Sequence, residues 1–411
     1  PLLPPPPSPP LVRSASSSVV YQRLWSSCRP RGAGGGSFRA GIEYVAGVGG
    51  MGSATIHELS SRGLKVLGLE KFKIPHSMGS SHGMTRIIRL AFREGSEYVP
   101  LARRSYELWR SLEQKVGEQL LYTTGSIHGG LPGTTAFEST LEACVTQKVT
   151  HEVLSGNEVS SRFPGYNFPD ETKAVFQADG GFLVPERCIK GYVSISRELG
   201  AVIHEEEPLL EWNPTSYGIS AVTHRGVYTA EKLIITSGPW TGKLLPEIAP
   251  LAVAERQVLA WFKPRNQEAF SPSNFPVFTL ATNEGSFYGF PSFDGYGFKL
   301  GKFHHFGEAV DPDNFSRTPT PEDEAVLRGF TGTYFPDALG ETEDMAVCLF
   351  TNSPDEHFII GTLANYPQVS VAAGFSGHGF KFCSAVGEIM ADISVSGETQ
   401  HNIELFDPSR F

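Results

Sequence analysis

The stretch that decides the fold reads Ile42-Glu43-Tyr44-Val45-Ala46-Gly47-Val48-Gly49-Gly50-Met51-Gly52, and a second apolar run ends eighteen residues later at Leu69-Glu70. This order predicts a strand, a glycine turn, a helix and a second strand that finishes in an acid. In such a unit Gly47 permits the tight turn, Gly49 lets the backbone approach a pyrophosphate, and Gly52 lets the helix pack close to the strand.

Two further features of the same stretch favour a dinucleotide over an ordinary glycine turn. The N-terminus of the helix offers free N–H groups to phosphates. Glu70 lies where a carboxylate accepts hydrogen bonds from an adenosine ribose, and a carboxylate repels the 2′-phosphate of NADP. FAD or NAD is therefore predicted, and this segment does not separate the two.

Composition narrows the class of protein. The chain has 411 residues, 40% of them apolar and 19% charged, which is enough for two domains with developed cores. The net charge of −10 argues against a nucleic-acid partner, and no apolar stretch is long enough to span a bilayer. The five cysteines are scattered without C-x-x-C spacing, which fits a reducing compartment and no structural metal.

Residues 1–38 differ from the rest of the chain. They are rich in proline, serine, glycine and arginine, and no acid precedes Glu43. Such a segment cannot bury enough apolar surface to order itself, so it is expected to be disordered or to target the protein. Its composition fits a mitochondrial or plastid transit peptide equally with a translated upstream region, and Ser409-Arg410-Phe411 only loosely resembles a peroxisomal signal. The compartment stays open between an organelle and the cytoplasm.

The order of predicted elements indicates two interleaved domains. Strand–helix–strand signals occur at the start, in the middle and at the end of the chain, and a β-rich block covers about 257–302. A predicted strand over 233–235 runs into a second small-residue turn that contains Gly238. The fold class that follows is α/β plus β, with a Rossmann-like domain and a β-rich domain.

Three patterns in the last third carry candidate chemistry. Lys299 lies within an apolar strand, where a lysine more often reaches to solvent, and Cys348 lies in another, where a thiol is usually inert. The run from Gly374 to Lys381 places glycines before a helix and resembles an anion-ready helix start, although a plain glycine loop has the same composition.

Taken together, these motifs resemble the monomeric sarcosine oxidase family, which includes sarcosine/pipecolate oxidases and N-methyltryptophan oxidase. The resemblance covers roughly residues 42–408, and it is carried by matches that occur in the family's order: 47–52, 79–83, 85–89, 288–291, 298–301, Cys348 with Thr351, 354–360 and 373–382.

The resemblance implies an FAD enzyme that oxidises the C–N bond of a secondary amino acid and passes the electrons to O₂ as hydrogen peroxide. It implies an FAD-binding domain over 39–120, 185–255 and 346–411 and a substrate domain over 121–184 and 256–345. It further implies a small-molecule substrate, a single-subunit protein, and no membrane partner.

The resemblance also assigns roles to residues. Cys348 corresponds to the cysteine that is bonded to the flavin 8α-methyl group, and Lys299 to the lysine that promotes O₂ reduction, where a fixed cation stabilises developing negative charge. Arg89 and Lys381 correspond to the pair that holds the substrate carboxylate.

The remaining assignments follow in the same way. Arg86 and His82 correspond to an arginine and a histidine beside the flavin, and Tyr288 to an aromatic residue of the substrate pocket. Further cofactor contacts are predicted at Ser81, Val202, Gly238, Gly377, Gly379 and Lys381.

One departure from the family stands out. The family places a histidine four residues after the lysine, where this chain has Phe303, with His304 next. A one-residue insertion could restore the histidine to the site, so the pocket wall and the substrate range are open. Three alternatives stay beside the sarcosine-type oxidase. The shift at Phe303 leaves open a flavin-binding protein without turnover, and the family also allows an amine oxidase for cyclic substrates such as L-pipecolate or proline. An NAD-linked dehydrogenase is the third, and it would leave Cys348 and 374–381 without a role.

Overall fold

A computed structural model describes residues 42–411, and it begins with the predicted strand, turn and helix. β1 (Ile42–Ala46) leads through the glycine turn into α1 (Gly50–Ser61), and β2 (Lys65–Leu69) returns parallel to β1. Gly47 adopts φ +93°, and a Cβ atom on Gly52 would lie 1.8 Å from the Gly47 carbonyl oxygen. Both positions therefore require glycine for the turn itself. The predicted segment 1–38 lies outside the described residues.

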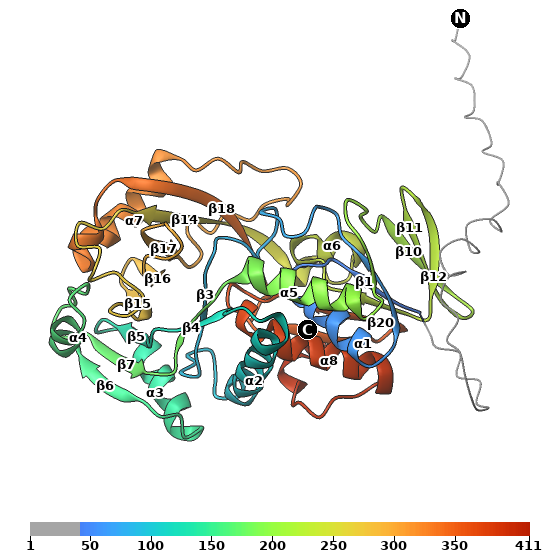
Figure 1. Cartoon of the computed structure of the whole chain (residues 1–411), viewed down its shortest axis with the longest axis horizontal. Coiled ribbons are helices and arrows are strands. Elements are labelled where there is room, and N and C mark those ends of the chain that lie inside the picture. Colours follow the sequence, from blue (N-terminus) through green and yellow to red (C-terminus); the bar gives the residue numbers. More distant parts are fainter. Residues whose placement is uncertain (1–41) are drawn as a thin grey trace, which may run out of the picture. The chain divides into compact units, whose positions relative to one another are not determined.

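A six-stranded sheet is built around this unit (Figure 1). Its order is β19-β20-β13-β1-β2-β9, and every neighbouring pair is parallel except β19 with β20. The strands that join β1 and β2 come from distant parts of the chain: β9 (Val202–His204), β13 (Lys232–Ile235), β19 (Ile359–Leu363) and β20 (Tyr366–Ala373).

Helices and a meander cover the two faces of this sheet. A shared apolar core joins it to four helices: α1, α2 (Tyr98–Val116), α5 (Pro185–Glu198) and α8 (Cys383–Ser396). A second core joins the same sheet to an antiparallel meander of β10 (Glu211–Thr215), β11 (Gly218–Thr223) and β12 (Gly226–Ala230). A parallel sheet buried on both faces is the arrangement that a Rossmann-like domain requires.

The β-rich part forms an eight-stranded sheet in the order β18-β14-β17-β16-β15-β5-β7-β6. Its pairs are antiparallel except β15 with β5. The strands are β5 (Ser126–Gly130), β6 (Glu152–Ser155), β7 (Lys173–Gln177), β14 (Val253–Phe262), β15 (Val277–Thr282), β16 (Gly285–Phe290), β17 (Phe298–Lys302) and β18 (Thr342–Asn352).

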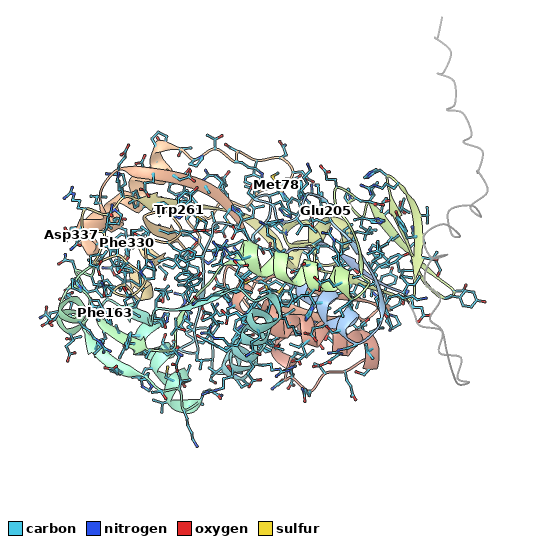
Figure 2. All side chains as sticks on the ribbon, in the orientation of Figure 1. Met78, Phe163, Glu205, Trp261, Phe330 and Asp337 are labelled. Carbon is cyan, nitrogen blue, oxygen red and sulfur yellow. The ribbon has the colours of Figure 1, made fainter. Side chains whose placement is uncertain are left out.

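An aromatic core holds α7 (Pro321–Tyr334) against one face of the eight-stranded sheet, and the rings of Phe287 and Phe330 stack at 3.8 Å. Figure 2 labels Phe330 on α7 and Trp261 on β14 in this part of the molecule, with Glu205 near the six-stranded sheet. The remaining elements are a small sheet of β3 (Arg86–Ile88), β8 (Gly181–Leu183) and β4 (Leu121–Thr123), and the short helices α3 (Ala136–Thr146), α4 (Gly156–Arg162) and α6 (Thr241–Leu244).

The predicted fold class, a Rossmann-like sheet interleaved with a β-rich part, is confirmed by this topology. The domain bounds given above stay a prediction.

Candidate functional site

One cavity runs from the glycine turn of the six-stranded sheet to the face of the eight-stranded sheet that is turned away from α7. Its first part is lined mainly by backbone and small residues: 46–51, Glu70, Pro208, Leu209 and 236–240. Its second part is lined by larger and charged side chains: Arg86, Arg89, Glu94, Thr279, Tyr288, Phe290, Phe303, Phe350, Thr351, His378 and Lys381.

The glycine turn leaves hydrogen-bond donors and space at the first part of the cavity. No side chain caps the start of α1, so its first N–H groups are free for a ligand apart from a long contact of 3.4 Å from the Gly50 N–H to Ser81 Oγ. A Cβ atom on Gly49 would meet no atom nearer than Ser81 Oγ at 4.0 Å. Gly49 therefore faces the open cavity, as its predicted role requires.

Glu70 is fixed at the end of β2 by the backbone around it. Its two carboxylate oxygens accept hydrogen bonds from the N–H groups of Val48 (2.7 Å) and Phe72 (2.9 Å), and His76 Nε2 lies 3.3 Å away. The side chain is buried yet lines the cavity. A carboxylate held in this position can accept from the hydroxyl groups of a ribose.

The rim of the first part contains an ionic cluster that sequence reasoning did not find. Asp313 accepts hydrogen bonds from Lys71, from Trp240 Nε1 (2.7 Å) and from Lys243 Nζ (2.7 Å), and Lys243 also donates to Asp311 (2.6 Å). The two acids come from the connection between β17 and α7, whereas the cations and Trp240 flank the six-stranded sheet. These contacts bring the two parts of the fold together over the cavity.

Strand alternation decides which side chains reach the second part of the cavity. On β17, Phe298 and Leu300 belong to the core under α7, so Lys299 between them points to the opposite face. In register on that face lie Trp261 of β14 and Phe290 of β16, and Lys299 Nζ lies 5.6 and 4.4 Å from their ring centres. A lysine is thus held between two aromatic rings.

The Lys299 ammonium is bound by three oxygen atoms of one short segment, residues 83–85. Nζ donates to the carbonyl oxygens of Gly83 (2.6 Å) and Thr85 (2.8 Å) and to Thr85 Oγ1 (3.1 Å). Burial lowers the pKa of Lys299 well below its usual value, and the positive charge of Arg86 lowers it further. Lys299 is 1% exposed and lies in the wall just behind the lining residues.

Arg86, which lines the cavity, contacts Cys348, which lies behind the lining residues. Arg86 donates to the carbonyl oxygens of Thr85 (2.9 Å) and Ser80 (2.8 Å), and its Nη2 lies 3.6 Å from Cys348 Sγ. His82 is buried nearby, where desolvation, followed by the charges of Arg86 and Lys299, lowers its pKa to about 3. His82 is therefore neutral at physiological pH, and its Nε2 has no partner among the described residues.

Arg89 and Lys381 lie around Phe92, on the other side of the cavity. The Arg89 Cζ and Lys381 Nζ atoms lie 5.0 and 4.9 Å from the Phe92 ring centre. Lys381 donates to the His378 carbonyl oxygen (2.6 Å), and burial, with Arg89 as the next cause, lowers its pKa to about 7. Two cations in one desolvated pocket are suited to bind a carboxylate, and we call this pair the candidate carboxylate receptor.

A carboxylate of the protein already pairs with this receptor. Glu94 accepts from Arg89 Nη2 at 3.0 Å and from Arg93 Nε at 3.2 Å, and it lines the cavity. Burial favours its neutral form, but Arg89 and then Arg93 hold the pKa of Glu94 well below its usual range. An incoming anion must therefore share or displace Glu94 at Arg89.

Three further side chains of the site were not among the predicted site residues. His128 of β5 lies 3.4 Å from Arg89 Nη1 and 2.8 Å from Thr279 Oγ1 through its Nδ1 atom, and Thr279 lies opposite His128 in the sheet. His378 stacks on Phe358 and bonds to the Glu356 carbonyl oxygen. The sheet register, which is not local information, brings His128 and Thr279 together next to Arg89, whereas His378 lies in the turn before α8 with Lys381.

The departure at position 303 is resolved by the structure. Phe303 lines the cavity, with its ring 4.8 Å from that of Tyr288 and under the Arg93 guanidinium. His304 adopts φ +56° and turns away to Glu255 and Glu356, which raise its pKa to about 9. The expectation that an insertion could return a histidine to the site is therefore wrong, because the left-handed turn at His304 directs it outward.

Other predicted cofactor contacts are distributed unevenly. Ser81, Gly238, Gly377 and Gly379 line the cavity, as do Gly47 and Gly49, while Gly52 lies one layer behind the turn. Val202 pairs with Leu67 inside the sheet and does not line the cavity. In this region of the chain, the residues that line the cavity are Pro208 and Leu209, which follow the end of β9.

The residues present fit an anionic dinucleotide with a ring system at its far end. The fit rests on the uncapped helix start, the open space at Gly49, and buried polar atoms of the lining that have no partner among the described residues: Thr351 Oγ1, His378 Nδ1 and Arg89 Nε. Within residues 42–411, no group of three or more His, Cys, Asp or Glu side chains could hold a metal, and no helix is both long and apolar enough to cross a membrane.

Comparison with known proteins agrees with this geometry. Residues 44–393 match the family model described as FAD dependent oxidoreductase. The chain is 40% identical over 372 residues to the monomeric sarcosine oxidase of Bacillus sp. (strain NS-129), and the aligned region covers 89% of this chain and 96% of that protein. It is 33% identical over 372 residues to the N-methyl-L-tryptophan oxidase of Yersinia pestis (strain Pestoides F), with 89% and 98% covered.

A solved structure confirms the architecture. The L-proline dehydrogenase from P. horikoshii superposes with a TM-score of 0.78 at 22% identity, over 90% of this chain and 97% of that one. The family match also settles the choice between FAD and NAD that the glycine turn left open, in favour of FAD.

Proposed function

We propose that this chain, which belongs to the FAD-dependent oxidoreductases and within them to the monomeric sarcosine oxidase family, oxidises the C–N bond of a small secondary or N-methyl amino acid. The observation that carries the proposal is the pair Arg89 and Lys381 around Phe92, in the same cavity that Lys299 backs. An amino acid offers one carboxylate to two cations, which leaves its amine end free to be oxidised by the flavin.

The cofactor is held, in this proposal, by the glycine turn, Glu70 and the backbone of 374–381, with Cys348 as its thioether attachment. FAD bound there would supply the two-electron oxidation of the substrate C–N bond to an imine, with O₂ as the final electron acceptor and hydrogen peroxide as its product. The resulting imine hydrolyses in water.

The chain's own residues then have separable tasks. Arg89 and Lys381 orient the substrate through its carboxylate, and Tyr288 and Phe303 exclude water around its apolar substituents. Lys299, fixed by three oxygen acceptors, supplies the positive charge that stabilises reduced oxygen. One subunit contains all of these groups, so we expect a monomer to suffice.

A panel assay for peroxide tests the reaction. Purified protein is offered sarcosine, N-methyltryptophan, pipecolate and proline under air, and peroxide is measured with a coupled peroxidase. We expect peroxide with at least one of them. A yellow protein that yields no peroxide with any of them would favour a flavin-binding protein without turnover, whereas a preference for pipecolate or proline would favour the cyclic-amine alternative.

Acid precipitation and intact-mass analysis test the attachment. We expect the pellet of the parent protein to stay yellow and its mass to include one flavin, and both properties to be lost in Cys348→Ala. Cys188→Ala is the matched control: neither thiol lines the cavity itself, but Cys348 Sγ lies 3.6 Å from Arg86 of the lining, whereas the equally buried Cys188 packs in the apolar core of the six-stranded sheet. A Cys348→Ala pellet that stays yellow would contradict the attachment.

A further inference from the structure

The turn that binds Lys299 has an unusual backbone. Gly83 and Met84 both have positive φ angles, +93° and +69°, and a methionine rarely adopts this conformation. All three oxygen atoms that accept from Lys299 Nζ belong to this turn or to the residue after it, Thr85. The position of the ammonium therefore depends on what holds the turn in its strained form.

One carboxylate holds the turn from behind. Glu186 Oε1 accepts hydrogen bonds from the N–H groups of Gly83 (2.8 Å) and Met84 (3.1 Å). Glu186 lies in the first turn of α5, where the helix favours a negative charge. Its second oxygen, Oε2, is buried without a hydrogen-bond partner among the described residues.

The charged groups that face Lys299 make this carboxylate important. Arg86 opposes the ammonium, whereas Glu186 and Cys348 favour it, the latter only as an ionised thiol. His82 also lies close, and it is neutral because burial lowers its pKa to about 3. A cysteine bonded to flavin cannot ionise, so among these groups Glu186 would be the negative charge that remains.

We infer that Glu186 is a positioning residue for Lys299: it fixes the turn at 83–85 whose oxygens bind the ammonium, and it supplies the charge that keeps this group cationic in a desolvated wall. The inference rests on the proposed function, in which Lys299 stabilises reduced oxygen. It assigns two effects to one side chain, a geometric effect through Oε1 and an electrostatic effect through the carboxylate charge.

Glu186→Gln separates the charge from the geometry, because the amide oxygen can still accept both N–H groups. The matched control is Glu113→Gln: Glu113 Oε1 accepts from two successive backbone N–H groups, those of Leu120 and Leu121, and lies away from the cavity. The first readout is a pH titration of the visible spectrum of the oxidised flavoprotein without substrate, which reports a change of charge beside the flavin. The second is the pH profile of O₂-dependent reoxidation in stopped flow.

We expect Glu186→Gln to move both midpoints to lower pH by about one unit or more, which corresponds to a tenfold larger acid dissociation constant of the Lys299 ammonium. Glu113→Gln should move neither midpoint. If the parent protein shows no spectral transition up to the highest pH at which it stays folded, Glu186→Gln should show a transition within that pH range. Unchanged titrations in Glu186→Gln would overturn the electrostatic half of the inference.

Met84→Gly tests the geometric half, since glycine loosens the turn without changing any charge. We expect it to slow reoxidation several-fold and to leave the spectral midpoint in place; an unaltered rate would contradict the positioning role. Lys299→Met distinguishes the inference from its premise. If the spectral transition of the parent survives in Lys299→Met, the proposed place of Lys299 beside the flavin is wrong, whatever Glu186 does.

Discussion

The two ends of the cavity are built from different materials. The end at the six-stranded sheet consists mainly of backbone N–H groups, glycines and one carboxylate, and about half of its lining comes from a single βαβ unit over 42–70. The end at the eight-stranded sheet consists mainly of side chains that come from β3 and the segment after it, from β15, β16 and β18, and from the turn before α8. A ligand that is the same in every turnover can be held by backbone, whereas chemistry on a variable substrate requires particular functional groups.

The variant with the largest expected effect alters only the end at the eight-stranded sheet, which we call the reacting end. Lys299→Met removes a buried cation without adding volume, and a lost electrostatic stabiliser of this kind typically costs about 10²–10³ in rate. We expect flavin reoxidation by O₂ to slow by that factor and flavin reduction by substrate to change far less, as measured in separate stopped-flow half-reactions. Retention of FAD should match the parent.

The control for this variant is Lys302→Met, three residues along the same chain segment at the end of β17, whose Nζ lies over Phe287 on the opposite side of the sheet. Reoxidation as fast as in the parent in Lys299→Met would remove the lysine from the mechanism. The proposed difference between the two ends would then lose the residue that distinguishes them most clearly.

The end at the six-stranded sheet, which we call the cofactor end, should instead be sensitive to changes that displace its backbone. In Gly52→Ala the new Cβ atom would lie 1.8 Å from the Gly47 carbonyl oxygen, so the turn must shift, and overpacking of this kind costs about 1–3 kcal/mol or more. We expect a lower free energy of unfolding, measured in urea, together with a lower ratio of flavin to protein absorbance.

Gly49→Ala is the informative partner of that variant. Its Cβ atom would have the nearest protein atom 4.0 Å away, so the protein itself has room for a methyl group. We expect normal stability and reduced FAD content, because the methyl group would occupy the space that a pyrophosphate needs. Normal FAD content in Gly49→Ala would show that the cofactor does not approach the turn.

The same contrast explains what could be predicted from the sequence. The cofactor end follows from spacing within one short stretch, so Gly47, Gly49, Gly52 and Glu70 all lie where local rules place them. Val202 is the exception, because it was placed by position along the chain, and the chain enters the cavity six residues later, at Pro208.

The reacting end depends on register between distant strands. Lys299, Arg89 and Lys381 received their roles through resemblance to a family, since the local patterns around Lys299 and Lys381 fit an ordinary strand lysine and a plain glycine loop equally well. His128 and Glu94 were missed because their role arises only when β5 and the segment after β3 are brought together. Glu186 was missed for the same reason, since its partners Gly83 and Met84 lie more than 100 residues earlier.

A smaller effect concerns the charge of Lys381. Its pKa is lowered to about 7 by burial and, next, by Arg89, so the ammonium is present below pH 7 and lost above it. A bound carboxylate favours the charged form and raises this pKa by about one to three units. Affinity for an anion should therefore be greatest below pH 7 and should fall about tenfold per pH unit above it, until the pKa of the complex is reached.

The measurement is a spectral titration of the flavoprotein with a carboxylate that lacks an amine, such as propionate, from pH 6 to 9. Omitting the amine removes the titration of the ligand from this range. In Lys381→Met we expect weaker binding at pH 6 and loss of most of the pH dependence. An affinity that is independent of pH in the parent would contradict the place of Lys381 in the anion site.

The smallest expected effect concerns the shape of the reacting end. Phe303 packs against Tyr288 at 4.8 Å and lies 4.9 Å beneath the Arg93 guanidinium, so this wall is apolar where the resemblance leads one to expect a histidine. Phe303→His would lose aromatic contact worth about 0.5–1.5 kcal/mol, which corresponds to roughly 2–10-fold. That loss should affect a cyclic substrate, whose ring can reach the wall, more than sarcosine, whose substituent is one methyl group.

The ratio of kcat/KM for pipecolate to that for sarcosine measures this difference and cancels changes in the amount of active enzyme. We expect the ratio to fall in Phe303→His and to stay constant in Phe306→His, because Phe306 is 53% exposed and does not line the cavity. A ratio that does not change in Phe303→His would mean that the substrate ring never reaches this wall. Specificity would then have to be set on the side of His128 and Thr279, where the sheet register leaves polar groups around the candidate carboxylate receptor.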